Sequence, residues 1–162
     1  LWVAILFGFI TVLFAVFYYN QFVTYQTQVD TEQAQIEAHL QRRKDLAKKY
    51  DLAFENLKNC IPIQKDMRDQ SSNHLYILNV NFESIGKNRA TLMKEFFNAE
   101  IITQVHYIPV ILHPHFKKIG YNEKNFPNSF KYYHSALTIP LFYDLSDEQQ
   151  AYVIKQVKKL IG

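Results

Sequence analysis

The sequence holds a single cysteine, Cys60, among its 162 residues. One thiol cannot build a disulfide framework, and it is compatible with a reducing compartment without proving one. Glycine is also scarce, at 4 residues, and there is no glycine-rich loop of the kind that cradles a phosphate group. Lysine and arginine number 18 against 15 aspartate and glutamate residues. This near balance, with scattered basic residues, argues against a nucleic-acid-binding surface.

The first segment, Leu1 to Tyr19, contains no charged side chain. A helix of about 19 residues, at about 1.5 Å each, spans a hydrocarbon core of roughly 30 Å. Trp2 at one end and Tyr18 at the other resemble interfacial anchors. A buried core helix is one alternative, and a cleaved signal peptide, with its basic start and small-residue cleavage site, is another. We expect a single-pass transmembrane helix over residues 1–19.

Basic residues cluster after this apolar segment, between Arg42 and Lys49. By the positive-inside rule this asymmetry favours a cytoplasmic location for the rest of the chain. Neither proline nor glycine occurs between Gly8 and Pro62, so the membrane helix is expected to continue as one long helix to about Leu57. Its apolar residues recur at helical spacing. This pattern favours packing against a neighbour over a cofactor site.

The remaining sequence predicts an α+β fold, in which the long helix is followed by a small sheet covered by helices on one side. Residues 74–82 and 101–110 have the composition of strands. Asn88 can cap one helix, Pro127 starts another, and Ser146 begins a capping box before the last helix.

Three histidines lie close together in the sequence, at His106, His113 and His115. The latter two flank Pro114 and are typical of a surface turn. A metal site is disfavoured, because no carboxylate or cysteine has a matching spacing. From composition alone, His106 is more typical of a half-buried structural histidine than of a ligand-binding group.

Five ordered motifs change this interpretation of His106. They are Tyr50-Asp51-x-Ala53-Phe54, Ser72-Asn73-His74-Leu75-Tyr76-Ile77-Leu78, Gln104-Val105-His106-Tyr107-Ile108-Pro109-Val110, Phe126-Pro127-Asn128 and Ala136-Leu137-Thr138-Ile139-Pro140-Leu141-Phe142. Together they resemble the C-terminal part of the DegT/DnrJ family of sugar aminotransferases. Within that family, the resemblance is closest to enzymes that aminate a UDP-linked 4-keto-6-deoxy sugar on the way to pseudaminic acid. It covers roughly residues 41–162.

The resemblance implies the small domain of a fold-type I aminotransferase that uses pyridoxal phosphate. In such enzymes a lysine of the large domain holds this cofactor as a Schiff base, and no lysine here matches that motif. The resemblance makes Gln104, Val105, His106 and Tyr107 contacts to a nucleotide-sugar substrate, and it allows a homodimer. It leaves no residue of this chain as a catalytic base, cofactor ligand or metal ligand, so we expect the chain alone to be inactive.

A second resemblance covers the N-terminal part. The apolar helix, Tyr19-Asn20-x-Phe22-Val23, Val29-Asp30 and Gln35-Ile36-Glu37-x-x-Leu40-Gln41-Arg42-Arg43-x-Asp45-Leu46 resemble the start of LemA-family membrane proteins, including magnetosome-associated members. The sequence thus resembles a chimera joined within a helix, either a natural fusion or an assembly error. We expect residues 1–19 to be a transmembrane helix, 20–45 a LemA-like amphipathic helix, and 46–162 an aminotransferase small domain.

Two functional hypotheses follow from the two resemblances. One is a membrane-anchored fragment of a nucleotide-sugar aminotransferase, and the other is a non-enzymatic LemA-like membrane protein that serves for interaction. The first accounts for about three quarters of the chain.

Overall fold

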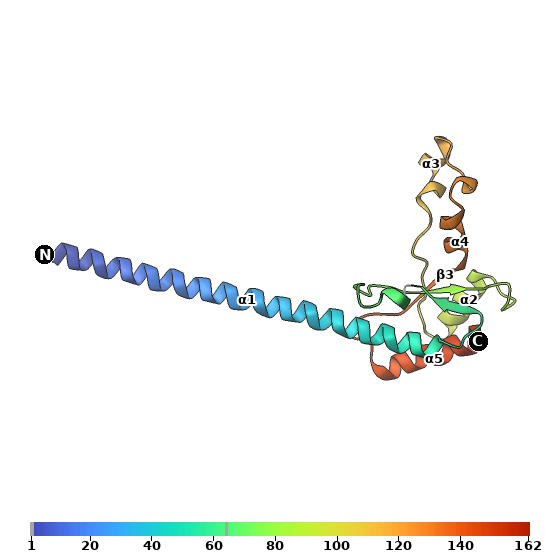
Figure 1. Cartoon of the computed structure of the whole chain (residues 1–162), viewed down its shortest axis with the longest axis horizontal. Helices are drawn as coiled ribbons and strands as arrows, with labels where there is room; N and C mark the ends of the chain where they lie inside the picture. The colour runs from blue at the N-terminus through green and yellow to red at the C-terminus, as the bar shows by residue number, and fades with distance from the viewer. Residues whose placement is uncertain (1, 64) are drawn as a thin grey trace. The chain divides into compact units, whose positions relative to one another are not determined.

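The computed structural model describes residues 2–63 and 65–162 (Figure 1). They divide into two compact units, with the boundary between Leu40 and Gln41. Eight helical segments and three strands occur in the described residues. The helical segments are α1 (Trp2–Phe54), η1 (Lys65–Met67), α2 (Arg89–Asn98), η2 (Val110–Leu112), α3 (Pro114–Lys118), η3 (Glu123–Asn125), α4 (Pro127–Ser135) and α5 (Asp147–Ile161). The strands are β1 (Cys60–Pro62), β2 (Tyr76–Val80) and β3 (Ala136–Ile139).

The first unit is the N-terminal part of α1. It contains the apolar part of Ile5–Phe54, the only helix in the described residues that is long and apolar enough to cross a membrane. Nothing within the described residues buries its most apolar window, and side chains such as Phe7, Leu13 and Phe17 are exposed. The hydroxyl of Thr11 donates to the Gly8 carbonyl oxygen at 2.7 Å, so this polar group is satisfied inside the helix. This part of the helix presents an almost wholly apolar surface.

The second unit is built on a three-stranded antiparallel sheet with the order β1-β2-β3. Tyr76 pairs with Ile139 and Leu78 with Leu137, and all four side chains are buried. Directly opposed residues of an antiparallel pair point to the same face, so these residues form the core face of the sheet. In β2, Asn79 lies between the buried residues Leu78 and Val80 and is exposed, as expected for a sheet covered on one side.

Helices supply the other half of this core. The end of α1 contributes Leu46, Tyr50 and Phe54, α2 contributes Leu92 and Phe96, and α5 contributes Val153, Val157 and Ile161. The predicted cap of α2 is confirmed, because the Asn88 side chain accepts from the Thr91 amide. The predicted capping box of α5, between Ser146 and Gln149, is confirmed as well.

Two predictions about strands are wrong. Residues 101–110 do not form a strand, and only Gln104 makes an isolated bridge, to Thr138. The helix that was expected to run from Pro127 through Ala136 ends at Ser135, and Ala136 begins β3 instead. The strand β1 was not predicted either. Proline at 109 and the excursion that follows it leave the 105–110 backbone without a partner strand.

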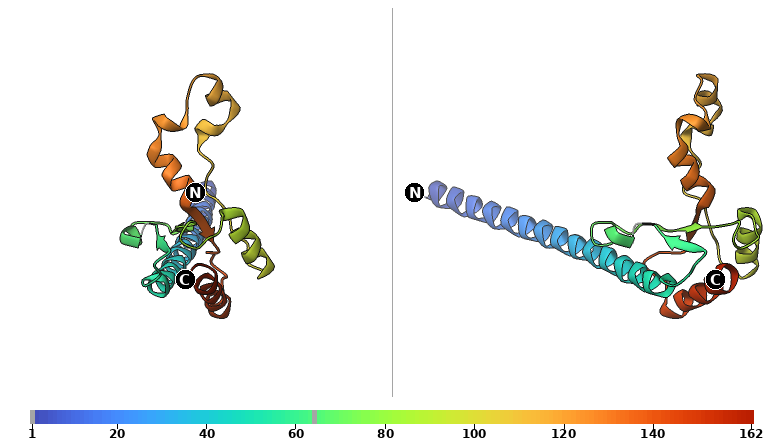
Figure 2. Two further views of the ribbon diagram at one scale, coloured as in Figure 1. Left: turned by 90° about the vertical axis from the view of Figure 1, so that its right-hand side faces the viewer. Right: turned by 45° about the vertical axis from the view of Figure 1, so that its right-hand side comes forward.

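That excursion is an arm, residues 107–135, which carries α3 and α4. In both Figure 1 and Figure 2 the arm leaves the sheet on the side away from α5. The chain therefore departs from the sheet just after His106 and returns directly into β3.

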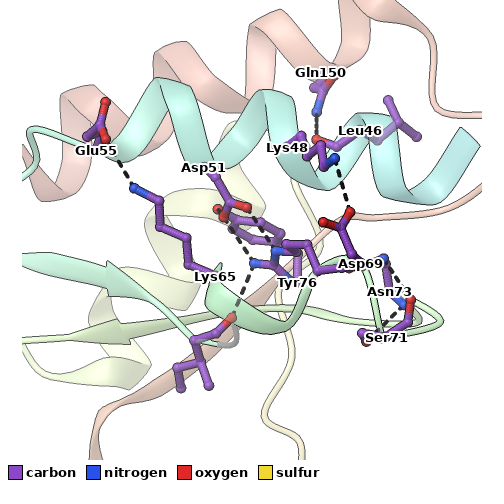
Figure 3. Close-up of polar contacts among 12 residues, drawn as sticks. Leu46, Lys48, Asp51, Glu55, Lys65, Asp69, Ser71, Asn73, Tyr76 and Gln150 are labelled. Atoms are coloured by element: carbon purple, nitrogen blue, oxygen red, sulfur yellow. Dashed lines mark hydrogen bonds and ion pairs between the residues drawn. The ribbon is translucent and has the colours of Figure 1, made fainter. Parts of the chain in front are cut away.

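A buried ion pair ties the end of α1 to the sheet, and Figure 3 shows Asp51 on α1 pointing toward Tyr76. Arg68 donates to both carboxylate oxygens of Asp51, at 2.9 and 3.1 Å. The hydroxyl of Tyr76 donates to the same carboxylate at 2.8 Å. The Arg68 guanidinium also stacks on the Tyr76 ring, 4.6 Å from its centroid. Asp51 and Arg68 are only 6% and 4% exposed, so each charge depends on the other.

Candidate functional site

The candidate site begins where the chain leaves the sheet. The Gln104 amide donates to the Thr138 carbonyl at 3.0 Å, and the Thr138 amide donates to the Gln104 carbonyl at 2.8 Å. This reciprocal pair fixes the segment that carries His106 beside β3. Thr138 is opposite Ile77 in β2, so its side chain lies on the face of the sheet away from the core residues Leu137 and Ile139.

His106 is half-buried and is held at two points. Its Nδ1 lies 3.0 Å from the Thr138 Oγ1. The hydroxyl of Tyr132, on α4, donates to the His106 carbonyl oxygen. The ring of Tyr107 meets the imidazole edge-on, with the ring centroids 4.7 Å apart. The imidazole is thus oriented by β3 and its backbone by the arm.

A surface cavity of about 270 Å³ adjoins this imidazole. Its polar lining is Gln104, His106 and Thr138, and its apolar lining includes Leu75, Ile102 and Phe142. A larger hollow of about 620 Å³ follows on the arm, lined by Tyr107 and Tyr132 among others. The arrangement suits a ligand that has both an apolar part and hydrogen-bonding oxygen or nitrogen atoms.

The four predicted substrate contacts do not all line the same cavity. Gln104 and His106 line the same cavity, and Tyr107 lines the neighbouring hollow. Val105 is half-buried. Two residues that orient His106, Thr138 and Tyr132, were not predicted. In the sequence, Thr138 stands out only as a polar residue between Leu137 and Ile139 in one of the quoted motifs. It is separated from His106 by 32 positions in the chain, and this spacing does not indicate a contact.

Charged side chains are nearly absent from the cavity beside His106 and from the hollow on the arm. No lysine or arginine lines either of them, or the hollow of about 480 Å³ between residue 100 and α5, which is lined by Glu100 and Glu148 among others. Burial raises the pKa of the Tyr132 hydroxyl, so this group stays a neutral hydrogen-bond donor at physiological pH. The cavity beside His106 thus offers hydrogen-bonding groups and apolar contact rather than lysine or arginine side chains.

Pyridoxal phosphate does not fit the residues that are present. A Schiff base requires a lysine amine, and no lysine lines the three hollows. A phosphate cradle requires converging backbone amides. The two glycines with positive φ, Gly86 and Gly120, lie outside the linings of these hollows.

His113 and His115 are exposed on the arm, at the start of α3. Within residues 2–63 and 65–162, no group of three or more histidine, cysteine, aspartate or glutamate side chains is placed to hold a metal ion.

Both the sequence and the fold of this chain are similar to those of known proteins. The family model described as "DegT/DnrJ/EryC1/StrS aminotransferase family" matches residues 27–158. The chain belongs to this family. The match begins at residue 27, so it covers most of the 20–45 segment that we expected to be LemA-like.

Individual relatives agree with this membership. The spore coat polysaccharide biosynthesis protein SpsC of Bacillus subtilis (strain 168) is 35% identical over 124 residues, which cover 74% of this chain and 31% of SpsC. The UDP-4-amino-4,6-dideoxy-N-acetyl-beta-L-altrosamine transaminase of Helicobacter pylori is 25% identical over 122 residues, which cover 74% of this chain and 32% of the transaminase. The chain thus spans about a third of the length of the curated relatives it matches.

A solved structure shares the fold. The PLP-form of the putative sugar aminotransferase Spr1654 from Streptococcus pneumoniae superimposes with a TM-score of 0.67 and 32% identity, over 76% of this chain and 31% of that one. The mixture of helices with a small antiparallel sheet is therefore a part of the aminotransferase fold.

Proposed function

We propose that this chain is the small domain of a pyridoxal-phosphate-dependent nucleotide-sugar aminotransferase, and that Gln104, Val105, His106 and Tyr107 contact the nucleotide-sugar. The observation that carries the proposal is the convergence of Gln104 and His106 on one cavity of about 270 Å³, in a segment matched by the family model. An imidazole there can donate to a sugar hydroxyl or to a diphosphate oxygen. The proposed substrate class is a UDP-linked 4-keto-6-deoxy sugar of the pseudaminic acid type. Support comes from the UDP-4-amino-4,6-dideoxy sugar in the name of the Helicobacter pylori relative, and from a solved Helicobacter pylori aminotransferase described as involved in the biosynthesis of pseudoaminic acid.

By itself the chain performs no amino transfer in this proposal. The cofactor is the electron sink of the reaction, and the hollows contain no lysine to hold it. The purified chain should show no absorbance of bound pyridoxal phosphate and no turnover of a UDP-4-keto sugar. A cofactor absorbance band that survives dialysis, or measurable turnover, would contradict this part.

The contact made by His106 is testable in a complete homologous aminotransferase. Replacing the histidine that matches His106 by alanine should weaken substrate use by about 1–3 kcal/mol, the range for one buried hydrogen bond. The cofactor spectrum should stay normal, because the residue contacts the sugar nucleotide and not the aldehyde. An unchanged kcat/KM would show that this histidine has a structural role and does not contact the substrate.

The apolar part of α1 serves as a membrane anchor in this proposal, with the second unit on the cytoplasmic side. Support comes from its length, its composition and the exposure of its side chains within the described chain. A LemA-like interaction protein is the alternative function, and it rests on the helical segment alone. Absorbance of bound pyridoxal phosphate in the chain co-expressed with a large domain would distinguish the two, because only the aminotransferase would retain the cofactor.

A further inference from the structure

Thr138 lies in β3, and its side chain forms part of the wall of the cavity beside His106. Thr138 is 6% exposed, and its amide and carbonyl are both paired with Gln104. This backbone pairing places the Thr138 Oγ1 3.0 Å from the His106 Nδ1. The contact between the hydroxyl and the imidazole is thus a consequence of strand register, and it does not depend on a free surface rotamer.

The direction of this hydrogen bond follows from what the hydroxyl needs. A threonine hydroxyl carries one hydrogen and two lone pairs, and a buried hydroxyl hydrogen without an acceptor is unfavourable. In the part of the chain that the structure describes, His106 Nδ1 is the recorded partner of this hydroxyl. The hydroxyl is therefore satisfied when it donates to Nδ1. In the opposite direction, with Nδ1–H donating to Oγ1, the hydroxyl hydrogen would have no protein acceptor among the contacts of the described residues.

Donation to Nδ1 fixes the tautomer of the neutral imidazole. With Nδ1 acting as acceptor, the ring proton resides on Nε2. When the imidazole gains a second proton, Nδ1–H appears, and the hydroxyl can rotate to accept from it. Nε2 therefore carries a proton in the neutral and in the charged form of the imidazole, and it is a hydrogen-bond donor in both.

We propose that Thr138 is a positioning residue that holds His106 in the Nε2–H tautomer, so that the cavity presents a donor and not a base to its ligand. The matching ligand atom is a hydrogen-bond acceptor, such as a sugar or phosphate oxygen. This identification of the ligand atom rests on the proposed function. The role of Thr138 toward the imidazole does not, because it is a property of the protein without ligand.

The test is the tautomer of His106 in the full chain, measured without ligand. The chain, labelled with ¹⁵N and held in detergent micelles, gives ¹H–¹⁵N correlations through two bonds that distinguish a protonated ring nitrogen from an unprotonated one. In the neutral imidazole, we expect Nε2 to be protonated and Nδ1 to be unprotonated. An Nδ1–H tautomer in the unmodified chain would overturn the proposal without any variant.

Variants of Thr138 distinguish an effect of its hydroxyl on the His106 tautomer from an effect of side-chain packing. Thr138→Val keeps the shape and removes the hydroxyl, so we expect the population of the Nε2–H tautomer to fall and a mixture to appear. Thr138→Ser should restore the single tautomer. Thr103→Val is the matched control, because Thr103 is also buried and its Oγ1 has no recorded partner among the described residues. That variant should leave the tautomer unchanged.

The result for Thr138→Val is decisive when the Gln104 and Thr138 amide resonances show that the strand bridge persists. A tautomer that is unchanged in such a folded variant would refute the role of Thr138. Because no nucleotide-sugar enters the experiment, this failure is distinct from a failure of the proposed function, which is tested by substrate use and cofactor absorbance.

Discussion

Asp51 and Arg68 form a buried charge pair whose two members depend on each other. Both charges lie in the core, and the carboxylate accepts from Arg68 and from Tyr76. Removal of one partner leaves an uncompensated charge, which typically costs 3–5 kcal/mol, roughly, in a buried pair. Asp51→Ala should therefore lower the free energy of unfolding of the second unit by about this amount.

Chemical denaturation followed by near-ultraviolet circular dichroism measures this change, because Tyr50 and Tyr76 lie in the core. Glu55→Ala is the matched control. Glu55 follows directly after the end of α1 and pairs with Lys65 at 3.1 Å at the surface. Such exposed pairs contribute about 0–1 kcal/mol. Equal losses for the two variants would show that the buried pair is not a main source of stability.

Cys60 is the second residue with a clear prediction. Burial raises the pKa of its thiol from 9.0 to about 11, so the reactive thiolate is rare at neutral pH. Alkylation by iodoacetamide at pH 8 should be much slower in the folded chain than in denaturant. Equal rates under the two conditions would contradict the buried position.

The same shift gives a pH dependence of stability. Below pH 9 the thiol is protonated in both the folded and the unfolded chain, and its contribution is complete. Between about pH 9 and pH 11 the unfolded chain loses this proton first, so the free energy of unfolding falls as the pH rises. Burial also raises the pKa values of the Tyr50 and Tyr76 hydroxyls, which extends the loss in the same direction at higher pH.

At the scale of elements, α1 is the clearest target for mutation. A charged side chain in the middle of a membrane helix costs about 2.5–3.5 kcal/mol on insertion scales. Val12→Arg should therefore release part of the protein from the membrane pellet after a carbonate wash, whereas the unmodified chain should remain there. Gln28→Arg is the control, because it places the same charge on α1 beyond the apolar segment. Recovery of the unmodified chain in the soluble fraction would refute the anchor.

Predictability from the sequence differs among the elements for physical reasons. Helices with caps, such as α2 after Asn88 and α5 after Ser146, can be predicted because the capping hydrogen bonds join residues that are close in the sequence. The strand β3 is buried at all four residues, so it lacks the alternation that identifies strands. The 101–110 segment has strand composition, but strands need a partner, and Gln104 alone finds one. The contact of His106 with Thr138 arises from that same tertiary pairing, which no spacing in the sequence reveals.

At the scale of the whole molecule, the second unit has both a core and a large exposed apolar surface. Leu52, Phe97 and Ile102 are 74%, 70% and 69% exposed, and further apolar side chains lie along the arm. Exposed apolar surface of this kind is typical of a part that packs against another domain or chain. A chain of residues 41–162 should therefore bind a hydrophobic dye and sediment as a concentration-dependent mixture. A monodisperse monomer that binds no dye would contradict this prediction.

Trp2 is the only tryptophan in the sequence, and it lies in the first turn of α1 with 83% of its surface exposed. Indole fluorescence excited at 295 nm therefore carries no information about the folding of Gln41–Gly162, whose optical probes are its tyrosines. The same emission is a specific reporter of the N-terminal turn. A blue shift on mixing with lipid vesicles, and quenching by brominated acyl chains, would read out the surroundings of this turn with no added label.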